Sequence, residues 1–254
     1  MSSAIMIAHQ QVRYLRRSGV IEDERFTRRL YTVAEAARLV GMSPSTLHTW
    51  SHGRQKNFSG RTQVAEGPVV TALEPSLGDR RSIPFIGLVE ATVVQAFRRT
   101  GLPLQRIRKA LSVLADQGEL EYALASRQLF SDGASVLYDY ATRSQDKQLR
   151  LLTVVHTGQR VFHEVIGEYL ERITFGDNWA TEIILPVTAE PLLRVVPGVA
   201  GGDAIFIEGG AALSAVRSRA SAGEPLKSIA DDYGTPACQI EEALCAIWPT
   251  QAAA

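Results

Sequence analysis

The sequence predicts a mainly α-helical fold with short β-hairpins, in which two helix-turn-helix modules are joined by a hairpin and a long helix. Apolar residues recur at helical spacing in several segments, and each of two short turns combines a glycine, a hydroxyl residue and a proline. Stretches rich in Gly, Ser and Pro separate these segments and predict turns. Of the 254 residues, 45% are hydrophobic and 21% are charged, so we expect ordinary cores distributed over two domains.

The first helix-turn-helix module is predicted at residues 31–51. Its first helix has apolar residues on one face, at spacings of three and four: Val33, Ala36, Ala37 and Val40. Gly41 can adopt positive φ and end this helix. Ser43 can cap the next helix, and Pro44 suits the first helical position because its missing N–H would be unpaired there. The spacing therefore predicts two helices that meet across a tight turn.

The second helix of this module is predicted to be amphipathic. Leu47 and Trp50 lie three residues apart and are expected to pack against the first helix. The remaining side chains then point toward solvent or a ligand: Ser45, Thr46, His48 and Thr49.

A hairpin wing is predicted after this module, over residues 53–84. The stretch is rich in Gly, Ser, Arg and Pro and contains β-like pieces at residues 69–73 and 81–85. Two further helices, at residues 86–99 and 104–115, are expected to close the first domain.

The middle of the chain is predicted to connect the two modules. Short alternating runs over residues 121–146 surround Ser131-Asp132-Gly133 and predict a second hairpin. Residues 158–173 predict a long helix with a wide apolar face, which we expect to form the interface of a homodimer. A strand-like run is predicted at residues 204–210.

Three short helices are predicted near the C-terminus, over residues 212–222, 226–233 and 236–247. Gly234-Thr235-Pro236 repeats the glycine stop, the hydroxyl cap and the proline of the first turn, so the last two helices are predicted to form a second helix-turn-helix. The predicted divisions are an N-terminal arm (1–30), the first module with its wing (31–117), the connector (118–190) and a compact C-terminal domain (191–254).

Charge is distributed unevenly along the chain, although the formal net charge is zero. Residues 1–110 contain 17 Lys and Arg against 8 Asp and Glu, and the remainder contains 10 against 19. A basic N-terminal half favours a polyanion such as double-stranded DNA, whereas an acidic C-terminal half favours a basic protein surface. Because carboxylates occur on both of its helices, the second helix-turn-helix is predicted to contact protein rather than DNA: Asp231, Asp232, Glu241 and Glu242.

Several classes of protein are not expected from this sequence. No apolar run approaches the roughly 18 residues of a membrane span, and the first residues lack the apolar region of a signal peptide, so we expect a cytoplasmic protein. Cys238 and Cys245 lie seven apart on one predicted helix, too far for a disulfide, and are predicted to be buried free thiols. Neither they nor His156 and His163 have the spacing of metal ligands, and no nucleophile elbow or phosphate-binding loop is found. We therefore expect no catalysis, no metal and no cofactor.

Residues 31–115 resemble the winged-helix domain of MerR-like regulators. The similarity lies in the first helix pair, in Arg81-Ser82-Ile83-Pro84-Phe85 as the strand that ends the wing, and in the closing helix pair that begins near Phe97. The resemblance implies that the helix after Ser43 enters the major groove while the wing follows the phosphates. The candidate DNA contacts are Ser43, Ser45, Thr46, His48 and Thr49 on the helix, and Arg54, Lys56, Arg61, Arg80 and Arg81 in the wing.

Residues 222–246 resemble the small C-terminal domain of long antitoxins that are paired with PIN-domain ribonuclease toxins. The matching text is AGEPLKSIADDYGTPACQIEEALCA, preceded by VVPGVAGG and AIFIEGG. The order of the two modules implies a VapB-like antitoxin that neutralises a PIN (VapC-like) toxin and represses its own operon. An arginine inserted into the toxin's acidic metal pocket is one physical route to neutralisation, and the candidates are Arg194, Arg217 and Arg219.

The alternative is a stand-alone MerR-like transcriptional regulator whose C-terminal half senses a small ligand. A neighbouring gene for a small PIN protein favours the antitoxin, whereas a metabolite that copurifies without a protein partner favours the regulator.

Overall fold

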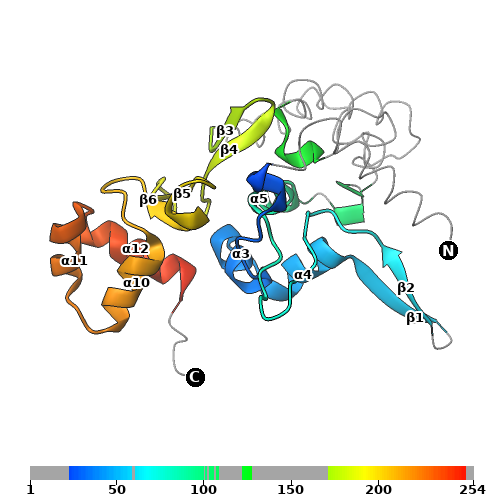
Figure 1. Cartoon of the computed structure of the whole chain (residues 1–254), viewed down its shortest axis with the longest axis horizontal. Coiled ribbons are helices and arrows are strands. Elements are labelled where there is room, and N and C mark those ends of the chain that lie inside the picture. Colours follow the sequence, from blue (N-terminus) through cyan, green and yellow to red (C-terminus); the bar gives the residue numbers. More distant parts are fainter. Residues whose placement is uncertain are drawn as a thin grey trace.

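The computed structural model describes residues 23–58, 61–99, 101, 103–105, 107–108, 122–127 and 171–249, with only the backbone described for the two strands of the first hairpin. The described chain is mostly helical. It contains an N-terminal helix-turn-helix, a two-stranded hairpin and an antiparallel sheet of four strands (Figure 1). In Figure 1 the helix-turn-helix lies at the centre, the hairpin projects to one side and the C-terminal helices lie on the other side.

The helix-turn-helix forms as the local sequence signals predict. Helix α3 (Val33–Val40) begins with a capping box, in which the Thr32 side chain accepts from the Glu35 N–H and the Glu35 carboxylate accepts from the Thr32 N–H. Gly41 ends the helix in the left-handed region, with φ of 74°. Helix α4 (Pro44–His52) follows, and Ser43 caps it by accepting the N–H of Thr46 at 3.2 Å. The predicted stop, cap and proline positions are therefore confirmed.

The hairpin lies earlier in the chain than its predicted strands. Strand β1 (Arg54–Phe58) pairs antiparallel with strand β2 (Arg61–Glu66), whereas residues 69–73 and 81–85 form no hairpin. The β-like apolar residues have other partners. The N–H groups of Val69 and Val70 both donate to the carbonyl of Trp50, and Ile83 forms a single bridge with Tyr31. These residues anchor a loop to the helix pair.

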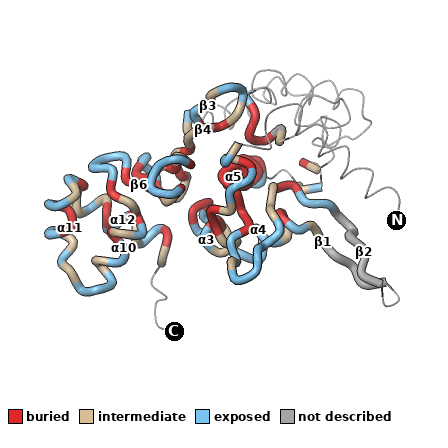
Figure 2. The backbone as a smooth tube through the Cα atoms, viewed as in Figure 1, coloured by how far each residue is buried: buried red, intermediate tan, exposed pale blue. Residues whose placement is uncertain are grey.

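Helix α5 (Phe85–Arg99) is the central helix of the fold, and Figure 2 shows it almost wholly buried. Gly87 allows the loop to approach it, because a Cβ added there would lie 2.3 Å from the carbonyl oxygen of Thr71. One turn later, Glu90 accepts the N–H of Thr71 at 2.6 Å. Burial raises the pKa of the Glu90 carboxyl to about 7. The helix predicted at residues 86–99 is therefore confirmed within one residue.

A four-stranded antiparallel sheet follows, in the order β3-β4-β5-β6. The sequence anticipates only its last strand. The strands are β3 (Ile173–Gly176), β4 (Trp179–Ile184), β5 (Leu193–Val195) and β6 (Ala204–Phe206). Asp177 and Asn178 connect the first two, both with positive φ, as hairpin turns of two residues require.

The connector differs from its prediction where the structure describes it. The helix predicted over residues 158–173 does not extend to residue 173, because Ile173 is the first residue of β3. Residues 158–170 of that prediction and the turn predicted at residues 131–133 lie outside the described residues. Residues 123–125 form a short 3-10 helix, η2 (Ala123–Ala125), and Ser126 forms an isolated bridge with Trp179. The sheet also crosses the division expected at residue 190, because β4 and β5 are hydrogen-bonded neighbours.

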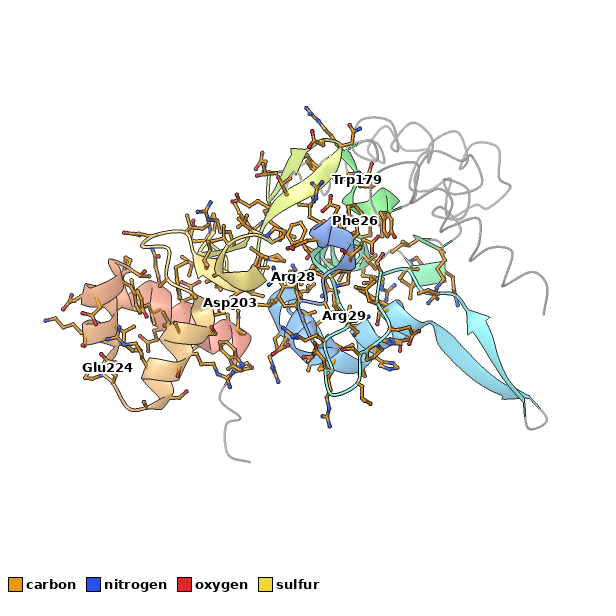
Figure 3. All side chains as sticks on the ribbon, in the orientation of Figure 1. Phe26, Arg28, Arg29, Trp179, Asp203 and Glu224 are labelled. Carbon is orange, nitrogen blue, oxygen red and sulfur yellow. The ribbon has the colours of Figure 1, made fainter. Side chains whose placement is uncertain are left out.

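Residues 23–30, predicted as part of an N-terminal arm, pack onto the core through Phe26 and Leu30. Helix α2 (Glu24–Thr27) buries Phe26 between the rings of Tyr122 and Trp179, with centroids 4.8 and 5.2 Å away. Figure 3 shows Phe26 beside Trp179 of the sheet. Nearby, the hydroxyl of Tyr31 donates to the carbonyl of Gly202 at 2.5 Å. Burial raises the pKa of that hydroxyl above its ordinary value. The helix-turn-helix and the sheet therefore share one core.

Three helices follow the sheet in the described part of the chain: α10 (Leu213–Ser221), α11 (Leu226–Tyr233) and α12 (Ala237–Ile247). Their predicted bounds are confirmed within one residue. Gly234 ends α11 with φ of 65°, as predicted. The predicted cap is wrong, because the Thr235 hydroxyl donates to the carbonyl of Glu208 at 2.8 Å and makes no capping bond to α12. That α11 and α12 act as a second helix-turn-helix remains a prediction.

Both cysteines are free and exposed, so the prediction of buried thiols is wrong. Helix α12 buries Ile240, Ala243 and Ile247, which are three and four residues apart. Cys238 and Cys245, seven residues apart, share a different face of the helix, and that face is open to solvent. Among the described residues, no helix is both long and apolar enough to cross a membrane.

Candidate nucleic-acid interface

Helix α4 presents a polar face to solvent and an apolar face to the core. Leu47 and Trp50 are buried, as predicted. Ser45 and His48 are exposed, and Thr46 and Thr49 are half-buried. This orientation suits a helix that enters a DNA groove, because base edges are reached by side chains on the outer face near the N-terminus.

The hydroxyl groups at the start of α4 form a local hydrogen-bond network. The Ser43 Oγ lies 3.0 Å from the Ser45 Oγ and 2.8 Å from the Thr46 Oγ1, and the Thr49 hydroxyl donates to the carbonyl of Ser45 at 3.0 Å. A hydroxyl has two acceptor positions besides its donor, so these groups keep hydrogen-bonding capacity toward a ligand. The network holds the side chains in place at the positive end of the helix dipole, which favours phosphate.

His52 extends this polar face and was missed by the sequence analysis. Its ring stacks on that of His48, with centroids 4.3 Å apart and planes 9° from parallel. The His52 Nδ1 lies 2.8 Å from the Ser51 Oγ. Ser45, His48 and His52 are spaced by three and four residues and form one exposed row. The four-residue spacing of the two histidines is the signal that could have found it.

The hairpin begins directly after α4, where Gly53 has φ of 76°. Arg54 and Lys56 are in β1, and Arg61 begins β2 opposite Phe58. In Figure 1 the hairpin projects well away from the core beside α4. A wing in this position suits contacts with the DNA backbone, and contact by these three cations stays a prediction.

Arg80 and Arg81 do not belong to this hairpin, so their predicted place in the wing is wrong. They follow a tight turn in which Ser76 bridges Asp79. The Arg81 guanidinium pairs with the Asp79 carboxylate at 2.9 Å, and these hydrogen bonds hold the pKa of Asp79 below its ordinary value. Arg80 is exposed. The misplacement arises because the loop returns to Tyr31 after the hairpin has closed.

Two of the three arginines predicted to contact a toxin are engaged in intramolecular ion pairs. Arg194 on β5 lies 3.4 Å from the Glu182 carboxylate on β4. Arg219 contacts the carboxylates of Glu224 and Asp232, the latter at 2.5 Å, and these hydrogen bonds raise the pKa of Arg219. The guanidinium of Arg217 instead lies 4.2 Å above the ring of Trp248. Of these three arginines, Arg217 alone shows no acidic partner among the residues that the structure describes.

The carboxylates predicted to face a protein partner lie on the surface of the last two helices: Asp231, Asp232, Glu241 and Glu242. All four are exposed. No group of three or more His, Cys, Asp or Glu side chains within the described ranges is arranged to hold a metal ion.

Comparison with known proteins gives three findings. A family model described as "Putative DNA-binding HTH domain" matches residues 29–111, which include α3, α4, the hairpin and α5. A Mycobacterium tuberculosis protein named "Putative antitoxin VapB45" is 38% identical over 229 residues, which cover 88% of this chain and 95% of that protein. The crystal structure of Rv2018 from M. tuberculosis is similar with a TM-score of 0.71 at 36% identity, over 87% of this chain and 99% of that chain.

Proposed function

The chain belongs to the family of the M. tuberculosis antitoxin VapB45, and from that premise we propose that it is the antitoxin of a type II toxin–antitoxin pair. It carries no catalytic activity. Its domain at residues 31–117 binds operator DNA as an autorepressor, and its domain at residues 191–254 neutralises a PIN-domain (VapC-like) ribonuclease. The observation that carries this proposal is the family match over residues 29–111 within a chain that aligns with VapB45 along most of its length.

The DNA is read by the exposed face of α4. Ser45, Thr46, His48 and Thr49 face base edges in the major groove, and His52 extends their row. The cations of the hairpin, Arg54, Lys56 and Arg61, follow the phosphates. Because operator half-sites are commonly paired, the chain acts as a homodimer. The helix expected to form the dimer interface, at residues 158–173, lies almost wholly outside the described residues.

Base reading and phosphate binding are expected to respond differently to substitution. His48→Ala should change the preference among operator variants, by about 1–3 kcal/mol at the affected base pair. Lys56→Ala should weaken binding to operator DNA and to scrambled DNA by the same factor. It should also reduce the slope of log K against log salt by about 0.9. Fluorescence anisotropy with both duplexes at several salt concentrations measures these effects. Lys227→Ala, an exposed cation on α11, is the matched control and should change neither.

If His48→Ala lowered the affinity for operator and scrambled DNA equally, base reading by α4 would be contradicted. Unchanged affinity in both the His48→Ala and Lys56→Ala variants would remove this module from the DNA interface altogether.

The toxin is bound by the acidic C-terminal helices. Their exposed carboxylates suit a basic rim on the partner, and Arg217 is the arginine best able to enter an acidic metal pocket, because Arg194 and Arg219 already hold carboxylates of their own chain.

Co-expression with the neighbouring reading frame tests the toxin assignment. A tagged chain should retain a small PIN protein through affinity purification and sizing and should abolish its ribonuclease activity. Arg217→Gln should weaken neutralisation at least about tenfold, the cost of one lost charge-assisted hydrogen bond of roughly 1.5 kcal/mol or more. Arg80→Gln, an exposed arginine outside the C-terminal domain, is the control. Retention of a metabolite and no protein would instead favour a stand-alone regulator.

A further inference from the structure

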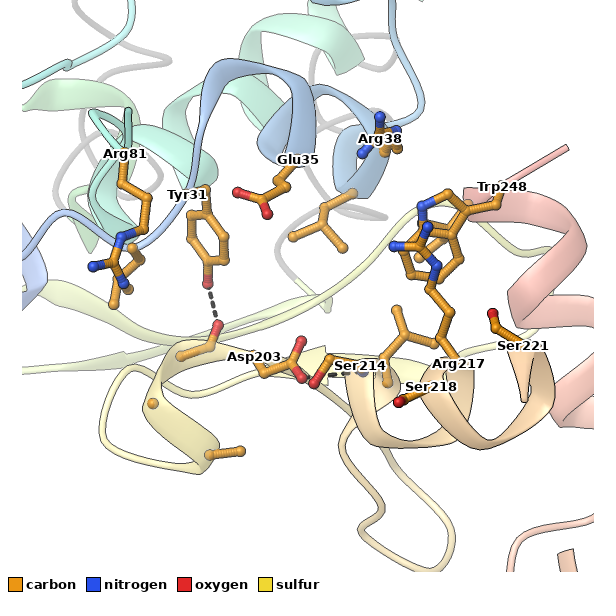
Figure 4. Close-up of a pocket in the computed structure, with 17 residues that line it drawn as sticks. Tyr31, Glu35, Arg38, Arg81, Asp203, Ser214, Arg217, Ser218, Ser221 and Trp248 are labelled. Atoms are coloured by element: carbon orange, nitrogen blue, oxygen red, sulfur yellow. Dashed lines mark hydrogen bonds between the residues drawn. The ribbon is translucent and has the colours of Figure 1, made fainter. Parts of the chain in front are cut away.

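A cleft of about 560 Å³ separates the helix-turn-helix from the C-terminal helices (Figure 4). One wall is the outer face of α3, which contributes Glu35, Arg38 and Leu39. The opposite wall is formed by α10 and the end of α12. The volume of the cleft is typical of a small-molecule pocket, since such pockets span about 300–1,000 Å³.

One end of the cleft contains hydrogen-bond donors without acceptors. In Figure 4, Arg38, Arg217 and Trp248 lie together at this end. Neither guanidinium forms an ion pair among the described residues. The Nε1–H of Trp248, beneath the guanidinium of Arg217, is buried and has no acceptor. An unpaired buried donor is costly, so this end of the cleft favours a group that supplies acceptor oxygens.

The acidic side chains of the cleft are already hydrogen-bonded within the chain. Glu35 accepts from the backbone N–H and from the hydroxyl of Thr32, both at 2.8 Å. Asp203 accepts the N–H of Ser214 at 3.1 Å. Among the described residues, neither carboxylate forms an ion pair with Arg38 or Arg217.

We propose that this cleft binds a small anionic ligand, whose carboxylate or phosphate group is held by Arg38 and Arg217. Planar guanidinium groups match the oxygens of both anions. Ser218 and Ser221, which also line the cleft, supply hydroxyls to the remainder of the ligand. This site goes beyond the proposed antitoxin function, which requires no small molecule, and it shares only Arg217 with the toxin contact proposed above. Because its walls come from α3 and from α10 and α12, a bound ligand also fixes these elements relative to one another.

The indole N–H resonance of Trp248 provides a direct test on the full-length chain. The chain has three tryptophans, and Trp248→Phe identifies the signal to follow. Inorganic phosphate, citrate and adenosine 5′-monophosphate serve as probes of the two anion chemistries. At least one of them should shift the Trp248 signal saturably, with a dissociation constant below about 1 mM, while Trp50 in the buried core is unaffected.

Arg38→Gln and Arg217→Gln should each raise that dissociation constant at least about tenfold, because each removes one charge-assisted contact. Arg80→Gln, an exposed arginine that does not line the cleft, should leave it unchanged.

Three results would overturn the proposal. The first is the absence of a Trp248 shift with every probe up to about 10 mM, well above any useful affinity. The second is a shift of the same size and affinity in both glutamine variants. The third is a shift produced by duplex DNA alone, which would assign the cleft to the nucleic-acid interface.

Discussion

Replacing Gly209 by alanine is expected to destabilise the C-terminal helices by about 3 kcal/mol or more, because backbone strain and steric overlap add. Gly209 has φ of +80°, and an added Cβ would lie 2.3 Å from both the carbonyl oxygen of Tyr233 and the Oγ1 of Thr235. The same Thr235 hydroxyl donates to the carbonyl of Glu208, so the clash falls on the contact that positions the turn between α11 and α12. Urea denaturation followed by circular dichroism measures the loss.

Gly210→Ala is the matched control for this substitution. Gly210 also has positive φ, at +71°, but an added Cβ would meet nothing within 4 Å. We therefore expect Gly210→Ala to lower the free energy of unfolding by only about 1 kcal/mol, which is the cost of the conformational strain. Equal losses in the two variants would show that Gly209 is required for its backbone conformation alone and that the close approach of Tyr233 and Thr235 is unimportant.

Glu90→Gln is expected to remove a pH dependence of roughly 3 kcal/mol from the free energy of unfolding. Burial raises the pKa of Glu90 from 4.5 to about 7 in the folded chain. Between these values the folded state holds a proton that the unfolded state has lost, so the free energy of unfolding decreases as pH rises from 4.5 to 7 and is then constant. At about 1.4 kcal/mol per pH unit, the interval corresponds to the expected effect.

The measurement is a series of denaturation curves from pH 5 to pH 8. Glutamine keeps an oxygen that can accept the N–H of Thr71, so the variant should fold and should lack the decrease attributed to Glu90. Glu241→Gln, an exposed residue of α12, should retain the full pH profile and serves as the control. Parallel profiles for wild type and Glu90→Gln would mean that Glu90 is not the titrating group.

The elements that the sequence predicts correctly are those determined by local signals. Gly41 and Gly234 each end a helix whose apolar face lies directly before them in the sequence. Both signals therefore fall within a short stretch of the chain and can be recognised without the tertiary structure. The four-stranded sheet is different. Its strands have only three to six residues, and the connections between them range from two residues, between β3 and β4, to eight residues, between β4 and β5 and between β5 and β6. Such short strands give no clear alternation, and their pairing is not encoded locally.

The same distinction applies to the candidate site. The outward orientation of Ser45 and His48 follows from the burial of Leu47 and Trp50, which helical spacing predicts. The partners of Arg81, Arg194 and Arg219 depend on which carboxylates the tertiary fold brings near them. A count of cations identifies a basic half of the chain, but it does not distinguish a cation available to a phosphate from one already paired.

The position of Phe26 has a consequence for the turnover of this protein. Its ring lies between the rings of Tyr122 and Trp179. The neighbouring Tyr31 donates a hydrogen bond to the carbonyl of Gly202. The four-stranded sheet therefore cannot separate from the helix-turn-helix without exposing aromatic surface to water. A protease that depends on local opening therefore finds few independent entry points in the shared core. Once that core opens, the described segments on both sides of it become accessible to a protease together.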